Sequence, residues 1–178
     1  MNDAHYNRMA RVLHWLIALL LLAQLAFGWW LGDIARDTPA RGYYVNLHKS
    51  VGLLLGLLIL ARIAWRLRHG APALPDFVPH WQQKLAAASH YLLYLLMLIV
   101  PVTGYLASNF SKHGVKFFNV LVLPPLGSDD KQLYALFNQT HKASAPLLLI
   151  LVVLHVAAAL MHGLRRDGIF SRIWQRSS

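Results

Sequence analysis

The chain of 178 residues has no cysteine and no glutamate, and only 13% of its residues are charged. The absence of cysteine excludes disulfides, thiolate metal sites, iron–sulfur clusters and cysteine nucleophiles. A soluble domain carries about 25% charged residues, so this composition argues against an ordinary soluble enzyme. Hydrophobic residues make up 57% of the sequence and lie in long blocks, which indicates an integral membrane protein.

The net charge of +10 would suggest nucleic-acid binding if the basic residues formed one face of a soluble fold. Instead, the Lys and Arg residues lie between the apolar blocks, as is typical of loops beside a membrane. The expected partner of this charge is therefore the lipid bilayer, and no nucleic acid is expected.

Four apolar blocks are long enough to cross a bilayer as helices, which takes about 20 residues each. They cover about residues 12–31, 44–65, 86–106 and 145–164. The expected fold is all-α, an integral membrane four-helix bundle in which residues 1–178 form a single domain. Residues 107–140 mix charged and apolar side chains, and we expect them to form a lid on the outer membrane surface. The fourth helix is expected to begin between His141 and Ala145.

The distribution of basic residues predicts the orientation, because cytoplasmic loops carry the excess of Lys and Arg. One side holds ten of them: Arg8, Arg11, Arg62, Arg66, Arg68, Lys84, Arg165, Arg166, Arg172 and Arg176. The other side holds seven: Arg36, Arg41, Lys49, Lys112, Lys116, Lys131 and Lys142. Both termini are therefore expected to be cytoplasmic.

Histidine is abundant, with ten copies, and several lie inside the expected spans, where an ionisable side chain is costly and points to function. His141 and His155 are 14 residues apart on one helix, which separates them by ~21 Å and leaves them ~40° apart around the helix. One helix thus presents two imidazoles at two depths. The outer one can meet His48, and the inner one can meet His14.

Two pairs of imidazoles at two depths favour two haems, because neutral imidazole is a good axial ligand for iron. A closed zinc site would need three or four clustered histidines here, and histidines at two depths cannot cluster. Gly52 and Gly56 follow His48 by one and two turns, and we expect them to leave backbone surface where a flat macrocycle could lie.

Four runs carry a resemblance over nearly the whole chain: LHWLIALLLL, NLHKSVGLLLG, SHYLLYLLMLIVPVTGY and HKASAPLLLILVVLHVAAALMH. In order and spacing they resemble the bacterial cytochrome b561 family. The resemblance implies a multi-pass dihaem cytochrome of the bacterial inner membrane, related to the cytochrome subunits of hydrogenases. It implies that His14 and His155 ligate the cytoplasmic-side haem b, and that His48 and His141 ligate the periplasmic-side one. Activities in the family include oxidation of superoxide, with the electron passing to ubiquinone.

Residue counting leaves a second choice open for the inner pair. His14 lies three residues beyond Arg11, whereas His155 lies ten residues before Arg165, so His162 matches the depth of His14 better. We favour His155, because Arg11 can snorkel and helices tilt. His162 is then available as a proton donor to a reduced quinone.

Further assignments are made on position alone. His162 is the expected catalytic residue, and Tyr6 and Arg8 are expected to join it around a quinone headgroup near the cytoplasmic end. On the outer side, Lys49, Lys112, Lys116 and Lys142 are expected to attract superoxide. His90 is expected to be a packing or interfacial residue, and four histidines are expected on the surface: His5, His69, His80 and His113.

Three functions remain open from the sequence. A self-contained superoxide:ubiquinone oxidoreductase is favoured, because the short loops offer little surface for a partner protein. The alternative is a cytochrome b subunit that links a periplasmic redox enzyme, such as a hydrogenase, to the quinone pool. A haem-carrying assembly or sensor protein without turnover is the third.

Overall fold

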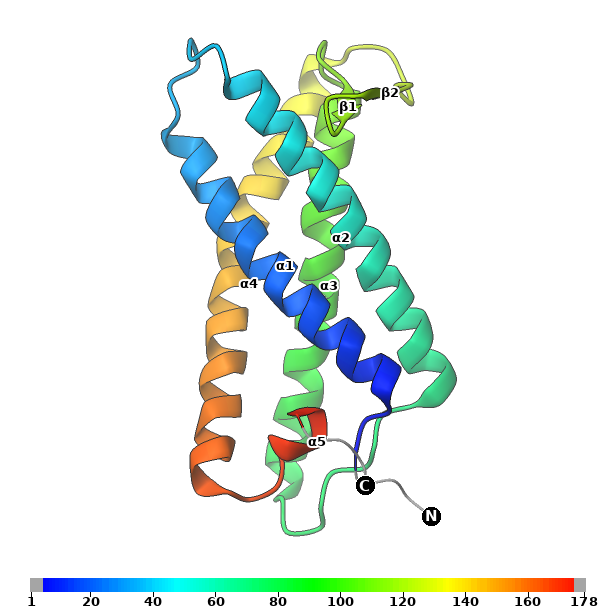
Figure 1. Ribbon diagram of the computed structural model, residues 1–178, viewed down its shortest axis with the longest axis vertical. Helices are drawn as coiled ribbons and strands as arrows, with labels where there is room; N and C mark the ends of the chain where they lie inside the picture. Colours follow the sequence, from blue (N-terminus) through cyan, green and yellow to red (C-terminus); the bar gives the residue numbers. More distant parts are fainter. Residues whose placement is uncertain (1–4, 175–178) are drawn as a thin grey trace.

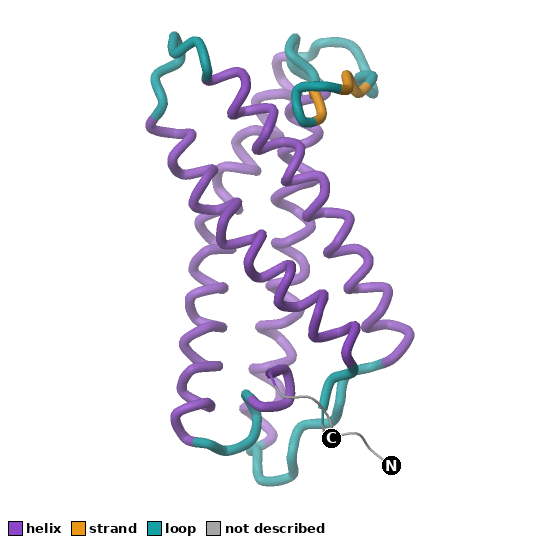
Figure 2. Tube along the Cα trace, in the orientation of Figure 1, coloured by secondary structure: helices purple, strands orange, loops and turns teal. Residues whose placement is uncertain are grey.

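The computed structural model describes residues 5–174, and within that range four long helices form an antiparallel bundle (Figures 1 and 2). The elements are α1 (Arg8–Asp33), α2 (Arg41–His69), α3 (His80–Asn109), β1 (Val115–Phe117), β2 (Leu121–Leu123), α4 (Lys131–Arg165) and α5 (Ser171–Trp174). The four helices α1 to α4 are each long and apolar enough to cross a membrane. The expectation of an all-α bundle with four apolar spanning helices is confirmed.

Local sequence signals set the helix ends. The Asn7 side chain accepts a hydrogen bond from the Ala10 amide and so caps α1. Asp130 caps α4 in the same way, by accepting from the amides of Gln132 and Leu133. At the end of α2, Gly70 takes a φ of 69°, a left-handed conformation that glycine adopts without steric cost.

The bundle has two distinct ends, visible in Figure 1. We call the end with β1 and β2 the hairpin end, and the opposite end, where α1 begins and α5 lies, the α5 end. The first residue of α1, Arg8, and the last residue of α4, Arg165, therefore both lie at the α5 end. The assignment of this end to the cytoplasm remains a prediction, and one residue counted for it, Arg176, lies outside the described residues.

The core lies between the helices and is small, as expected for a bundle whose outer surface faces lipid. Six buried apolar side chains form it: Ile17, Leu21, Leu55, Ile59, Leu93 and Leu148. By contrast, Leu19 and Leu57 are 67% and 64% exposed, which suits contact with acyl chains. The most extensive helix contacts join α3 to α4 and α1 to α2, and α2 also packs on α3.

The segment between α3 and α4 is shorter than the expected lid. Because Asp130 caps the helix, α4 already begins at Lys131, ten residues before His141. The loop that remains carries an antiparallel hairpin, with Lys116 paired to Val122. Helix α2 holds this hairpin in place, since Lys49 Nζ donates to the Gly114 carbonyl at 2.8 Å. The location of this segment on the membrane surface remains a prediction.

Candidate functional site

At the hairpin end, the structure brings His48 of α2 next to His141 of α4. The two ring centroids are 6.2 Å apart and the ring planes are inclined at 84°. Two glycines lie against these rings: a Cβ on Gly28 would lie 3.0 Å from His48 Cε1, and one on Gly104 would lie 3.0 Å from His141 Nδ1. A side chain at either position would therefore displace a histidine ring.

A backbone carbonyl fixes one ring of this pair, and the other ring has a nitrogen without a partner among residues 5–174. His141 Nδ1 donates to the Val100 carbonyl at 2.8 Å, so Nε2 is the nitrogen with a free lone pair. Gln24 Nε2 donates to the His48 carbonyl at 2.6 Å and steadies the helix at that residue. His48 Nδ1 is buried and has no hydrogen-bond partner among residues 5–174. A buried ring nitrogen without a partner calls for a ligand or another explanation.

At the α5 end, His14 of α1 lies next to His155 of α4. Their ring centroids are 6.3 Å apart at an inclination of 66°. A third imidazole, His90 of α3, packs edge-on against His155 with centroids 5.4 Å apart. His90 Nδ1 donates to the Ala86 carbonyl at 2.6 Å. His90 is thus in contact with the inner pair, a position that the sequence did not indicate.

The spacing of both pairs suits a metal ion held between two imidazoles. His48 with His141, and His14 with His155, would each hold such an ion, since metal–nitrogen bonds measure about 2.0–2.1 Å. Each pair also joins α4 to a helix with which it makes no extensive backbone contact, α2 at one end and α1 at the other. Among residues 5–174 there is no cluster of three or more ligating side chains that could hold a metal by itself. The residues therefore fit two planar groups with bis-histidine ligation, such as haem b, better than zinc.

The glycines expected to face a macrocycle have another role. A Cβ on Gly52 would lie 3.3 Å from Gln24 Nε2, and one on Gly56 would lie 3.6 Å from Pro101. Both glycines therefore lie at contacts between helices, and their expected place against a macrocycle stays a prediction. The glycines at the histidines, Gly28 and Gly104, were missed as site residues.

A spacing of 14 residues would have revealed them. It separates His14 from Gly28 on α1, and His90 from Gly104 on α3, as it separates His141 from His155 on α4. On α2 the same spacing separates His48 from Arg62. Residues 14 apart lie ~21 Å apart on nearly one helix face. Each helix thus contributes one residue to each level.

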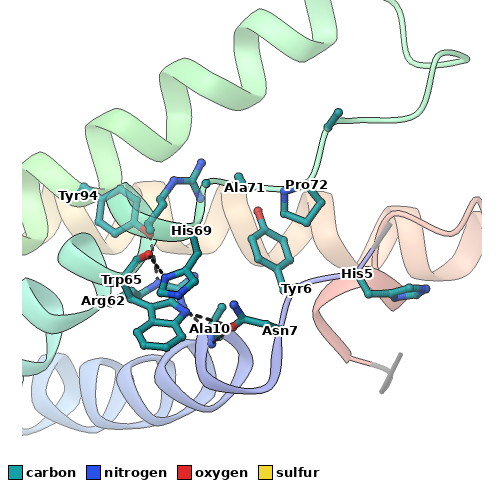
Figure 3. A pocket seen from close by; sticks show the side chains of 13 residues that line it. His5, Tyr6, Asn7, Ala10, Arg62, Trp65, His69, Ala71, Pro72 and Tyr94 are labelled. Carbon is teal, nitrogen blue, oxygen red and sulfur yellow. Dashed lines mark hydrogen bonds between the residues drawn. The ribbon is translucent and has the colours of Figure 1, made fainter. Parts of the chain in front are cut away.

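The residues expected around a quinone do not share one pocket. Tyr6 lines a pocket at the α5 end, shown in Figure 3, which neither Arg8 nor His162 lines. Arg8 is exposed at the first residue of α1. His162 Nδ1 instead donates to Asp167 Oδ2 at 2.6 Å. His5 and His69, expected on the surface, line the pocket with Tyr6.

Asp167 lies just beyond the end of α4, and hydrogen bonds shape its acidity. Burial raises the pKa of Asp167, but the hydrogen bonds from the His162 ring and the Ile169 amide outweigh burial and leave this pKa below its ordinary value. The carboxylate holds the proton of His162 on Nδ1, so Nε2 is the nitrogen that can exchange a proton.

The four lysines expected to attract an anion lie at the hairpin end in different settings. Lys112, Lys116 and Lys142 are exposed, whereas Lys49 is half-buried and bonded to Gly114. Lys49 directly follows His48, and Lys142 directly follows His141. Two of the four lysines are thus neighbours in sequence of the histidine pair at this end.

Comparison with known proteins agrees with this arrangement. The family model described as "Prokaryotic cytochrome b561" matches residues 5–176. The chain is 29% identical over 176 residues to "Cytochrome b561 homolog 2" of Escherichia coli (strain K12), covering 97% of this chain and 93% of that protein. It is 25% identical over 167 residues to "Cytochrome b561 homolog 1" of the same strain, covering 92% and 93%. To the "Probable superoxide oxidase CybB" of Yersinia pestis it is 25% identical over 153 residues, covering 84% of each chain.

The family match spans nearly the whole length, and the bundle presents its histidines in pairs at two levels. The expectations of haem-based electron transport and of a prokaryotic membrane location follow from the same match and are confirmed. This chain belongs to the prokaryotic cytochrome b561 family.

Proposed function

We propose that the protein is a superoxide:ubiquinone oxidoreductase that carries two haems b. The observation that carries the proposal is the presence of one imidazole pair near each end of the bundle, His48 with His141 and His14 with His155. A relative of this chain is named a probable superoxide oxidase, which supports this chemistry. Haem b supplies one-electron chemistry when bound.

In the proposed reaction, two superoxide anions are oxidised to two molecules of dioxygen. One ubiquinone takes up the two electrons with two protons and becomes ubiquinol. Superoxide is a small anion that forms outside the bilayer, whereas ubiquinone is dissolved in it. The hairpin end is the proposed side of superoxide oxidation and faces the periplasm.

The hairpin end has the charge that this role needs. Exposed Lys112, Lys116 and Lys142 create a positive field near His48 and His141, and such a field raises the encounter rate with an anion. The fourth lysine, Lys49, contributes its charge from a fixed position, because its ammonium is bonded to Gly114. It thereby also holds the hairpin over the end of α2.

The α5 end has a group that can supply protons. The His162 ring is oriented by Asp167, and its Nε2 is the proposed proton donor to the reduced quinone. Tyr6 and Arg8 lie at the same end and are the further residues proposed near the quinone headgroup. Proton donation by His162 does not require contact between His162 and Tyr6.

Stopped-flow mixing of the oxidised protein with superoxide tests this function. We expect rapid reduction of the haem absorbance, followed by reoxidation when ubiquinone is present. Dithionite serves as the control for reducible haem. Reduction by dithionite without any reduction by superoxide would exclude the proposed donor.

The second candidate, a cytochrome subunit for a periplasmic redox enzyme, is supported by the apolar surface of the hairpin. Val120 is 88% exposed there, and Leu121, Val122 and Leu126 are also exposed. A partner protein could cover such a surface. A protein that purifies alone with both haems and oxidises superoxide would exclude this role as the main one.

A further inference from the structure

A pocket of about 390 Å³ at the α5 end contains two arginines and no carboxylate among the described residues. Figure 3 shows Arg62, Trp65 and His69 of α2 on one wall, with Tyr94 of α3 beside them and Tyr6 opposite. Arg66 also lines it. The only ion pair among residues 5–174 is that of His162 and Asp167, so neither arginine is paired with an acidic side chain.

Arg62 stands at the level of the inner histidine pair. It is 14 residues from His48 and so lies on nearly the same face of α2, ~21 Å nearer the α5 end. Its Nη1 donates to the Ala10 carbonyl at 2.7 Å, and its Nε donates to Tyr94 Oη at 3.2 Å. These bonds hold the guanidinium in place and leave Nη2 available.

Arg66 follows one turn later, and its guanidinium donates to no described residue. Its guanidinium lies 5.8 Å from the centroid of the Tyr94 ring, and it makes no hydrogen bond within residues 5–174. Arg66 is only partly exposed. A pair of half-buried guanidinium groups without an acidic partner is costly unless an anion joins them.

We propose that Arg62 and Arg66 bind the propionate carboxylates of the haem held by His14 and His155. Guanidinium groups bind carboxylates through paired, charge-assisted hydrogen bonds, and haem b carries two propionates. The pocket adjoins the inner pair, since Ala10 of its lining precedes His14 by one turn of α1. The inference depends on the proposed ligand pair, but not on superoxide or ubiquinone as substrates.

The test measures the midpoint potentials of both haems in the purified full-length protein, together with the propionate bands of the resonance Raman spectrum. Arg66→Gln is the main variant, because Arg66 holds no other described group by a hydrogen bond. Loss of this positive charge destabilises the reduced state of the nearby haem. We therefore expect about a tenfold smaller equilibrium constant for reduction of one haem, which lowers its midpoint potential by about 59 mV. The other potential should not change, and the Raman propionate bands should shift.

Arg68→Gln is the matched control. Arg68 is on the same helix and is exposed, and it does not line the pocket. The control removes the same charge and should leave both potentials and the Raman bands unchanged. Arg66→Lys keeps the charge but not the paired hydrogen bonds, so it should restore most of the potential while the Raman bands remain shifted.

Two results would overturn the inference. One is an Arg66→Gln variant with wild-type potentials and Raman bands, while His14→Ala still loses one haem; the ligand pair would then stand and the propionate contact would fail. The other is loss of binding of inorganic phosphate or of phosphatidylglycerol vesicles by Arg66→Gln, with both potentials unchanged. The pocket would then serve an external phosphate group. Retention of both haems by His14→Ala would instead contradict the ligand pair.

Discussion

The two ends of the bundle hold the same pair of imidazoles in opposite surroundings. At the hairpin end, α1 and α3 present glycines to His48 and His141, so their backbones come up to the rings. At the α5 end, α3 presents His90 and α2 presents Arg62 at the corresponding level. The first level has glycines against its rings, and a hairpin lies over its end of the bundle. The second is polar and opens into a pocket.

This difference shows how one ligand set can serve two tasks. The proposed metal ligands are alike, so differences between the two sites would come from their surroundings. Glycine lets the backbones of α1 and α3 approach the rings of His48 and His141. Arg62 places a positive charge at the level of His14 and His155, His90 adds a third imidazole there, and a pocket lies beside them.

Removal of a ligand should have the largest effect. His48→Ala or His141→Ala should remove the haem of the hairpin end, and His14→Ala or His155→Ala that of the α5 end, because one imidazole does not replace two axial ligands. The haem-to-protein ratio should fall from two to one in each variant, as measured by the pyridine haemochrome assay. His162→Ala is the control and should keep both. Loss of a haem in His162→Ala, with both kept in His155→Ala, would overturn the pairing.

Loss of the proposed proton donor should have the next largest effect. His162→Ala with both haems present should slow ubiquinone reduction by about a hundredfold, the lower range for a general acid, while haem reduction by superoxide stays near wild type. Asp167→Asn keeps the imidazole but loses the carboxylate that orients it, so we expect a smaller decrease. Steady-state quinone turnover over a range of pH measures both. Wild-type turnover in His162→Ala would assign that residue to the interface only.

A methyl group at the hairpin end should affect one site only. In Gly28→Ala, the new Cβ would lie 3.0 Å from His48 Cε1, so the ring must shift. Overpacking costs about 1–3 kcal/mol, and we therefore expect about 5- to 160-fold weaker haem retention at the hairpin end. Gly32→Ala, on the same helix with nothing within 4 Å of the new Cβ, is the matched control. Haem content after detergent dialysis measures the effect, and equal retention in both variants would show that the close approach of α1 is not needed.

The smallest expected effect concerns the exposed lysines. Replacing Lys112, Lys116 and Lys142 together with Gln should slow haem reduction by superoxide up to about tenfold and flatten its dependence on ionic strength. Salt screens such charges over a Debye length of about 8 Å at 0.15 M. A neutral reductant is the control, and its rate should hardly change. A triple variant with the rate and salt dependence of the wild type would leave these lysines with lipid headgroups as their only partners.

The sequence by itself determined the membrane class, the four helices and the two levels of histidine. Long apolar blocks permit few structures in a bilayer, because every backbone polar group must be bonded internally. The helical period then converts the 14-residue spacing of His141 and His155 into a statement about depth and face. Apolar length and residue spacing are properties of single helices, so they can be derived without knowledge of how the helices pack.

The tertiary structure decided which residues of different helices come into contact. Counting along the helices could not separate His155 from His162 as the partner of His14, because tilt changes depth by several residues. The packing places His155 beside His14, and the turn after α4 brings Asp167 to His162. It likewise assigned Gly52 and Gly56 to helix contacts, and it placed Arg62 and Arg66 in a pocket to which residues 5–174 contribute no acid. Such contacts join residues far apart in the chain, and they depend on how the helices cross, which no single helix specifies.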